Sequence, residues 1–421
     1  MKVECFDSDC DRSFSGGVLP VRLFAQPPRK GWAACGQHIA NRIRVERLDV
    51  PTAAKDFLRL ALGVIAADRG VRRKDSQNCW NRRIELIVPV EDSQLWNDRS
   101  PEVEEMLQFL SGDIWSVQFK PAQQQLGRED DRRTYLTGDT VSLLSGGADS
   151  LVGAIDLASA GEDWIAVSQT SSEKEVQSHF ANIASAKSHF PWTHGINIPY
   201  EADGNERARS IGFFAFAVVA ATATRAYHDD HLIPIHASEN GLISLNPPLT
   251  PARIGSASTR TTHPTFVTQL QNLLRGFGLN VELKNEYQYK TKGEMFKECQ
   301  SPDLLTSALN HSMSCGKSGR INQHCGRCVP CIIRRAAFHA SSINDNADYL
   351  IGPTSDPAAF QKSDDVRCAM IGSERHADLP WLKRVILPSL AKAEGIDRGA
   401  LIDVASRGLL EVNNYLNSVL K

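Results

Sequence analysis

The sequence of 421 residues has no long hydrophobic run. Its longest uncharged apolar stretch, 210–224, has 15 residues and lies between Arg209 and Arg225. An α-helix needs roughly 20 apolar residues to cross a bilayer. The first residues contain no apolar core of signal-peptide length and carry several acids. We therefore expect a buried core helix at 210–224 and a cytoplasmic protein with no membrane contact.

The sequence also lacks a strong net charge. Its formal charge is -2, from 47 Lys and Arg against 49 Asp and Glu. A protein that coats nucleic acid through a general basic surface carries a positive excess, so we do not expect nucleic acid as a partner. The 42% hydrophobic and 23% charged residues are typical of a globular protein. One core serves roughly 250 to 300 residues, so the length predicts two or more domains.

A third absence is the P-loop of kinases and ATPases, G-x-x-x-x-G-K-[ST]. The Gly-Lys-Ser at 316–318 has His311 where the first glycine is required, which excludes that device. Ten cysteines are present. In the cytoplasm they are expected to be reduced, metal-bound or inert rather than paired.

The hydrophobic pattern divides the chain into four parts. Residues 1–122 mix helical and strand patterns and predict an α+β module that offers a docking surface for a partner. Residues 123–137 are polar and charged and predict a linker. Strands and helices alternate in 138–340, which predicts an α/β domain with a parallel sheet covered on both faces. Residues 341–421 predict a helical C-terminal extension.

Individual elements follow from the same patterns. In the first part we expect helices at 51–67 and 101–110 and strands at 82–90 and 113–120. In the α/β domain we expect strands at 140–144, 163–170, 195–200 and 231–238, with helices between them. Nucleotides bind at the carboxyl ends of the strands in such sheets.

The stretch TVSLLSGGADS (140–150) places a glycine-rich turn between a strand and a helix. Such a turn exposes backbone N–H groups at a helix start, where phosphate binds. Gly146 and Gly147 permit close approach, while the hydroxyls of Ser145 and Ser150 add donors. Asp149 either caps the helix or helps to position Mg²⁺. The alternative is an ordinary Gly-Gly turn with Asp149 as its N-cap.

Four cysteines form a second motif, with the spacing C-x9-C-x2-C-x2-C. They are Cys315, Cys325, Cys328 and Cys331. Four thiolates at this spacing can close a tetrahedral structural zinc site. A thioredoxin-like redox pair needs a single C-x-x-C and fits poorly. An iron–sulfur cluster is the other alternative, and the neighbouring His324 is an alternative ligand.

The SGGADS stretch resembles the SGGxDS signature of the PP-loop ATP pyrophosphatases, which belong to the HUP-like adenine nucleotide alpha hydrolases. Combined with the cysteine spacing, and with the segments 206–210 and 289–295, it resembles the QueC family over about 138–340. QueC uses ATP and ammonia to convert 7-carboxy-7-deazaguanine to its amide and then its nitrile. The resemblance implies ATP, Mg²⁺ and structural Zn²⁺ as cofactors.

The same resemblance assigns site residues. The ATP site comprises Leu144, Ser145, Gly146, Gly147, Asp149 and Ser150. Asp149, Arg209 and Lys292 are the catalytic candidates, because cations at 209 and 292 can neutralise charge that builds on phosphate. Both cations are alternatively ordinary surface or helix-start residues. Substrate candidates are Arg207, Asn240, Arg260 and His263.

The longer layout, with segments 239–251 and 255–264, resembles the QatC group of QueC-like proteins from the Qat anti-phage cassette. That resemblance implies a defence role and a QatB-like protein partner. We expect transfer of the deazaguanine acyl group to an amine of that partner. The alternatives are a free nitrile made with ammonia, a PP-loop enzyme that modifies tRNA, and a non-catalytic nucleotide-binding scaffold.

Overall fold

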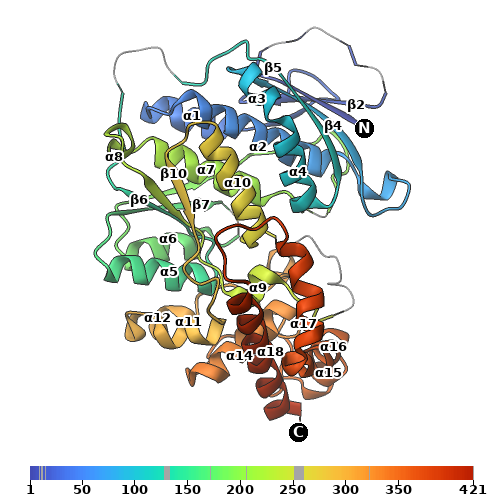
Figure 1. Ribbon diagram of the computed structural model, residues 1–421, viewed down its shortest axis with the longest axis vertical. Helices are drawn as coiled ribbons and strands as arrows, with labels where there is room; N and C mark the ends of the chain where they lie inside the picture. The colour runs from blue at the N-terminus through green and yellow to red at the C-terminus, as the bar shows by residue number, and fades with distance from the viewer. Residues whose placement is uncertain are drawn as a thin grey trace.

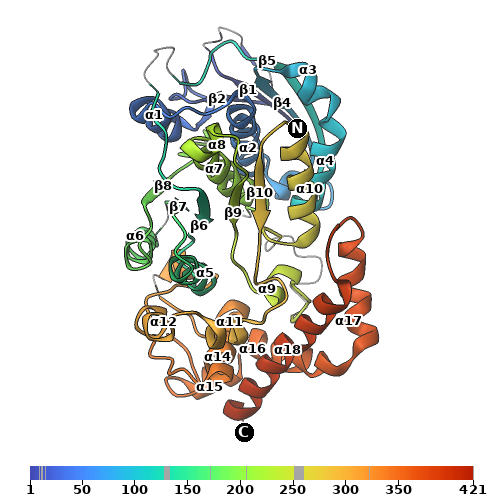
Figure 2. The same ribbon diagram turned by 60° about the vertical axis from the view of Figure 1, so that its left-hand side comes forward.

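In the computed structural model, the chain forms two five-stranded parallel sheets with helices between and around them (Figure 1). The C-terminal helices lie at the end of the molecule away from the N-terminal sheet in both views (Figures 1 and 2). The structure describes residues 1–420 except 9, 11–12, 15, 128–132, 171, 205, 251–259 and 322. Part of the expected linker and the first half of the 255–264 segment therefore lie outside the described residues.

The N-terminal sheet has the strand order β3-β2-β1-β4-β5, and every pair of neighbours is parallel. Its strands are β1 (Lys2–Phe6), β2 (Val18–Leu23), β3 (Ala33–Cys35), β4 (Arg83–Val90) and β5 (Ile114–Pro121). Its helices are α1 (Gln37–Glu46), α2 (Thr52–Gly70), α3 (Ser93–Asp98) and α4 (Ser100–Ser111). The helices and strands expected at 51–120 are confirmed.

The expected α+β class of this module is wrong, because a wholly parallel sheet with crossover helices is α/β. The expectation missed β1, β2 and β3, which have only three to six residues each. Strands that short carry too little periodicity to stand out from a loop. Without them, two strands and two helices gave no sign of a doubly wound sheet.

The second sheet has the order β10-β9-β6-β7-β8 and is also parallel throughout, as expected. Its strands are β6 (Thr140–Leu143), β7 (Trp164–Gln169), β8 (Ser188–Trp192), β9 (Ile233–His236) and β10 (Val281–Lys284). The helices between them are α5 (Ala148–Ser159), α6 (Lys174–Ile183), α7 (Ser210–Thr222), α8 (Arg225–His228), α9 (Gly241–Leu245) and α10 (Pro264–Gly276).

The strand expected at 195–200 is wrong. The third strand, β8, lies earlier in the chain and contains Pro191. Proline is tolerated there because β8 is an edge strand, but it disguises the strand in the sequence. The alternating apolar residues of 195–200 instead face the N-terminal domain, where Ile196 and Ile198 pack against the core and Asn197 pairs with Ala34.

The two sheets share one hydrophobic core. Helix α2 packs against the N-terminal sheet and α7 against the second sheet, and the two helices pack against each other. Contact is close, since a Cβ added to Gly212 of α7 would lie 2.6 Å from Ile65 of α2. Helix α7 is buried on nearly all sides, so the expected core helix at 210–224 is confirmed.

The remaining helices pack on the far side of the second sheet. They are α11 (Lys292–Glu298), α12 (Pro302–Leu309), α13 (Ser318–Ile321), α14 (Val329–Ser341), α15 (Pro357–Gln361), α16 (Asp364–Ser373), α17 (Leu379–Ile386) and α18 (Arg398–Leu420). Helix α18 forms a separate hydrophobic cluster with α9, α14 and α16. The expected helical C-terminus is confirmed. Among the described residues, no helix has the length and apolar character of a membrane span.

Candidate functional site

The glycine-rich loop follows β6, the central strand of the second sheet. The strand beside β6 on one side is β7, the next along the chain, and on the other side it is β9. This reversal of strand order is the point at which open α/β sheets bind ligands, beyond the carboxyl ends of the strands. The loop and residues 238–240 after β9 therefore face one another across a crevice.

The loop is held in shape by its own side chains. Gly146 has a φ of +85°, which disfavours other residues. The Ser145 hydroxyl accepts a hydrogen bond from Gly147 N at 3.2 Å, and the Ser150 hydroxyl donates to Gly147 O at 3.0 Å. Helix α5 begins at the next residue with no side-chain cap. Residues 147–150 at this helix start line a cavity, and the unpaired N–H groups of a helix start favour anions.

Asp149 is not the N-cap of α5, so the simple capping alternative is wrong. It lies in the first turn, is 8% exposed, and accepts a hydrogen bond from Asn240 Nδ2 at 2.7 Å. Lys292 Nζ donates to its other carboxylate oxygen. The structure thus brings together three predicted residues from three parts of the chain. A triphosphate bound here would meet one lysine whose charge a buried carboxylate already orients.

The start of α11 positions Lys292. Thr291 and Glu294 form a reciprocal capping box at this helix start. The carboxylate of Glu411, on α18, accepts hydrogen bonds from the Thr291 hydroxyl and from Gly293 N. Burial raises the pKa of Glu411 to about 7. The C-terminal helix therefore supports the lysine that faces the loop.

Glu239 belongs to this site and was missed in the sequence. It follows β9, lines the crevice beside Asp149 and Lys292, and accepts a hydrogen bond from the Thr262 hydroxyl. Burial raises the pKa of Glu239 to about 7, while the bond from Thr262 opposes that rise. The available signal was an acidic residue directly after a strand of the parallel sheet.

Two cavities adjoin the loop. The smaller, of about 260 Å³, is lined by Gly147, Asp149, Ser150, Glu239 and Lys292 among others. The larger, of about 940 Å³, contains Leu144, Gln169, Arg209 and Phe213 in its lining. Ser145 and Pro330 line both. The larger cavity alone has the size of a small-molecule site, and it runs from the loop to Cys315 and Cys328 of the cysteine cluster.

Three of the four substrate candidates lie apart from these cavities. Arg207 stacks over Trp80, 4.4 Å from the ring centre, and donates to Ser111 O. Arg260 lies over Phe109 and donates to its carbonyl oxygen. His263 caps α10 and is bonded to Ser389, and burial lowers its pKa to about 3. Of the four, Asn240 alone contacts the loop helix.

The four cysteines converge on one point. Their sulfurs all lie within 4.8 Å of one another, with Cys315 to Cys328 at 3.9 Å and Cys325 to Cys331 at 4.0 Å. Four sulfurs bound to one zinc at 2.3 Å would lie about 3.8 Å apart. The four cysteines of an iron–sulfur cluster are shared among two or four irons, so at least some of their sulfurs lie farther apart than this. The set fits a single tetrahedral ion.

Backbone groups complete the cysteine site. Cys315 Sγ accepts from the N–H groups of Lys317 and Cys325, each at 3.3 Å, and Cys325 Sγ accepts from Cys328 N at 3.3 Å. Such bonds stabilise thiolates, the form that binds metal. His324 is bonded to Ser312 O and stands outside the group of four sulfurs.

One segment of the chain is similar to a known protein family. Residues 261–342 match the family model described as queuosine biosynthesis protein QueC. This segment contains Lys292 and all four cysteines. Over this segment the chain is similar to QueC. The glycine-rich loop lies outside the matched segment and is linked to it by the hydrogen bond from Lys292 to Asp149.

The chain is similar to two curated proteins named 7-cyano-7-deazaguanine synthase. It is 56% identical to that of Rhizobium etli over 36 residues, 9% of this chain and 14% of the relative. It is 40% identical to that of Rhizobium rhizogenes over 53 residues, 11% of this chain and 22% of the relative. The matches thus span less than a quarter of either relative. No solved structure matches significantly.

Proposed function

We propose that this protein is an ATP-dependent enzyme that adenylates a carboxylic acid and transfers the acyl group to an amine. One observation carries the proposal: Asp149, next to the glycine-rich loop, is bonded to Lys292, 143 residues away, at the switch point of the sheet. An ordinary turn needs no lysine from a distant helix. The QueC match over the segment that supplies Lys292 supports the same assignment.

The chemistry assigns a role to each element. An oxygen of the acid attacks the α-phosphorus of ATP, and pyrophosphate leaves. The N–H groups at the start of α5, with Ser145 and Ser150, hold the departing phosphates, and Lys292 offsets the negative charge that builds on them. A nitrogen nucleophile then attacks the acyl carbon, loses a proton, and releases AMP. Arg209, in the larger cavity, is available to the anionic reactant.

Two metals belong to the proposal. Mg²⁺ would accompany the triphosphate, with the carboxylates of Asp149 and Glu239 as the nearest acidic groups. Zn²⁺ would be held by the four cysteines and would fix the segment between α12 and α14 that borders the larger cavity. We place the protein in the cytoplasm, where thiols remain reduced.

The acid in this proposal is 7-carboxy-7-deazaguanine, and the amine is supplied by a QatB-like partner of an anti-phage cassette. The resemblance to QueC supports the acid, and the QatC-like layout supports the partner. The N-terminal domain adds a complete five-stranded sheet, which a reaction with ammonia does not require. Free nitrile formed with ammonia is the competing product.

The test is one incubation with ATP, Mg²⁺ and 7-carboxy-7-deazaguanine, with and without the co-expressed partner. We expect AMP and pyrophosphate to form only when the acid is present, and the partner to gain the mass of the acyl group. Asp149→Ala is the matched negative control, since it removes the group that orients Lys292. If the wild-type protein forms no AMP, the proposal that it is an enzyme is wrong. If it forms AMP together with a free nitrile, the proposal that the acceptor is a protein is wrong.

A further inference from the structure

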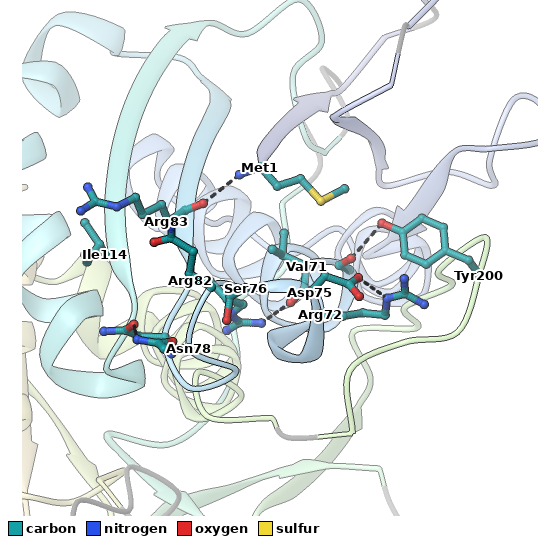
Figure 3. Close-up of a pocket in the computed structure, with 13 residues that line it drawn as sticks. Met1, Val71, Arg72, Asp75, Ser76, Asn78, Arg82, Arg83, Ile114 and Tyr200 are labelled. Atoms are coloured by element: carbon teal, nitrogen blue, oxygen red, sulfur yellow. Dashed lines mark hydrogen bonds and ion pairs between the residues drawn. The ribbon is translucent and has the colours of Figure 1, made fainter.

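Helix α7 is reached through a connecting segment, residues 194–204 and 206–209, that follows β8. The segment lines two cavities. Tyr200 borders a cavity of about 640 Å³ at the amino ends of β4 and β5 (Figure 3). Gly204, Glu206 and Arg209 border the larger cavity beside the glycine-rich loop. The segment thus forms part of the wall of the proposed reaction site.

The backbone of the connecting segment is bonded to the N-terminal domain. Ala34 and Asn197 exchange two backbone hydrogen bonds, of 3.0 and 2.8 Å. Asp203 N donates to Arg69 O at 2.8 Å. Ala208 N donates to the carboxylate of Asp68 at 2.8 Å. The last of these bonds lies one residue before Arg209.

Side chains add further links between the segment and the N-terminal domain. The Tyr200 hydroxyl donates to Gly70 O at 2.8 Å, as a dashed line in Figure 3 shows. Arg73 N donates to the carboxylate of Asp203 at 2.6 Å. Arg69, in the last turn of α2, pairs with Glu206 at 2.9 Å. Glu206 lies 3.6 Å from Arg209, so one chain of charges runs from α2 to the cavity.

The anchor on the N-terminal side is rigid. Asp68 is bonded to Arg73 and Arg82, and both arginines are also bonded to Asp113. All four side chains are at most 4% exposed. Buried ion pairs resist displacement, because removing one partner leaves the other charge buried and unpaired, which is costly. Asp68 can therefore hold Ala208 N in a constant position.

We propose that the N-terminal domain positions Arg209 for the anionic reactant in the larger cavity, with Arg69 and Tyr200 as positioning residues. An irregular segment has no ladder of strand bonds to fix it, so its shape depends on these links. Arg69 also holds Glu206, the carboxylate nearest to Arg209, and limits how closely Glu206 neutralises that cation. The inference rests on the proposed function only in assigning the cavity to the acid.

The test uses the full chain and the double variant Arg69→Gln/Tyr200→Phe, neither position of which lines the larger cavity. Hydrogen–deuterium exchange of peptides covering 194–209 should become about tenfold faster, since one hydrogen bond and one partly exposed ion pair are lost. KM for 7-carboxy-7-deazaguanine should rise about fivefold with kcat within about twofold, as expected when a binding contact alone is lost. Arg69→Lys with Tyr200 intact should restore wild-type exchange and KM.

Arg42→Gln is the matched control, because Arg42 pairs with Glu46 within α1 of the same domain. It should change neither exchange of the segment nor KM. Unchanged exchange in the double variant would overturn the inference, and so would a fall in kcat at constant KM. If the wild-type protein forms no AMP, the proposed function fails, whereas the exchange experiment still decides whether the N-terminal domain holds the segment.

Discussion

The two sheets have the same strand order when the strands of each are numbered along the chain: 3-2-1-4-5. Each therefore has a switch point beside its first strand, where a crevice is expected beyond the carboxyl ends. In the second sheet this crevice holds the glycine-rich loop and opens into cavities. In the N-terminal sheet the corresponding place holds a set of buried ion pairs.

Arg59 of α2 fills the N-terminal crevice. Its side chain is fully buried and donates to Asp56 at 2.8 Å, to Glu91 at 3.0 Å and to Gln124 O at 2.6 Å. Asp7, directly after β1, accepts from the backbone N–H groups of Gln123 and Gln124. These bonds occupy both terminal nitrogens of Arg59 and the carboxylate of Asp7, so the charged groups described at this crevice pair with one another.

The comparison shows that strand order creates a crevice, and that the residues after the first strand decide its use. The second sheet places Gly146 and Gly147 there, which leave space and exposed N–H groups. The N-terminal sheet places a carboxylate there and closes the space with an arginine. We therefore expect the N-terminal domain to support the second domain, to which it is bonded through the connecting segment.

Among substitutions that test this difference between the two crevices, the largest effect is expected in the second sheet, beside the glycine-rich loop. Lys292→Gln should lower AMP formation about 100- to 1000-fold, because a group that stabilises charge in the transition state is lost. Acid-dependent AMP release is the measurement. Lys290→Gln is the control, since Lys290 pairs with Glu298 on the surface at 2.8 Å. Activity of the Lys292 variant within threefold of wild type would contradict the assignment.

A substitution in the N-terminal crevice should change the stability of the protein rather than its catalytic activity. Arg59→Met leaves buried carboxylates without their cation and should lower the free energy of unfolding by about 3–5 kcal/mol. Urea denaturation measures this change, and kcat of the protein that remains folded should stay near wild type. Loss of activity at unchanged stability would show that the N-terminal crevice is a functional site. The proposed difference between the two crevices would then be wrong.

Replacing a cysteine should affect metal binding in the four-cysteine cluster but not in the N-terminal domain. Wild-type protein should hold about one zinc per chain, and Cys331→Ser should lose most of it together with part of its stability. Cys35→Ser should keep the metal, because Cys35 is buried in the N-terminal domain, where burial raises its pKa well above the usual range. Elemental analysis decides between these outcomes. Iron in place of zinc, with visible absorbance, would contradict the proposed ion.

The smallest effect concerns the acids of the two crevices. Glu91 receives a hydrogen bond from Arg59, whereas Glu239 receives one from the Thr262 hydroxyl. The folded-state pKa of Glu239 is raised from 4.5 to about 7. Its contribution to stability is therefore full below pH 4.5 and is lost as the pH rises through 7.

The side chain of the Glu239→Gln variant is neutral at every pH. The variant should therefore lack the loss of stability that deprotonation of Glu239 causes. Relative to wild type, the variant should gain about 1–3 kcal/mol in unfolding free energy between pH 5 and pH 8. Urea denaturation at both pH values measures the difference. A constant difference between the two proteins would show that Glu239 titrates normally.

Much of the fold could be predicted because long elements carry strong periodicity. The apolar helix at 210–224 and the C-terminal helices are examples. The errors share a cause, since β1 to β3 are short and β8 contains a proline at a sheet edge. Their strand character comes from neighbours in the sheet rather than from their own residues.

The site could be predicted only in part. SGGADS and the cysteine spacing are local patterns, and the structure places each where a ligand can reach it or an ion can be held. Glu239 and Asn240 reach the loop across the sheet, and Glu411 supports Lys292 from α18. Contacts between such distant positions leave no local pattern in a single sequence.

By itself the sequence determined the glycine-rich turn, the four-cysteine set and the alternating elements of the second sheet, because each depends on residues close together in the chain. Tertiary structure alone decided which of two crevices with the same strand order stays open. It also decided that the N-terminal domain and α18 hold the walls of that crevice. Burial and charge pairing act between residues far apart in the chain, and folding is what brings them into contact.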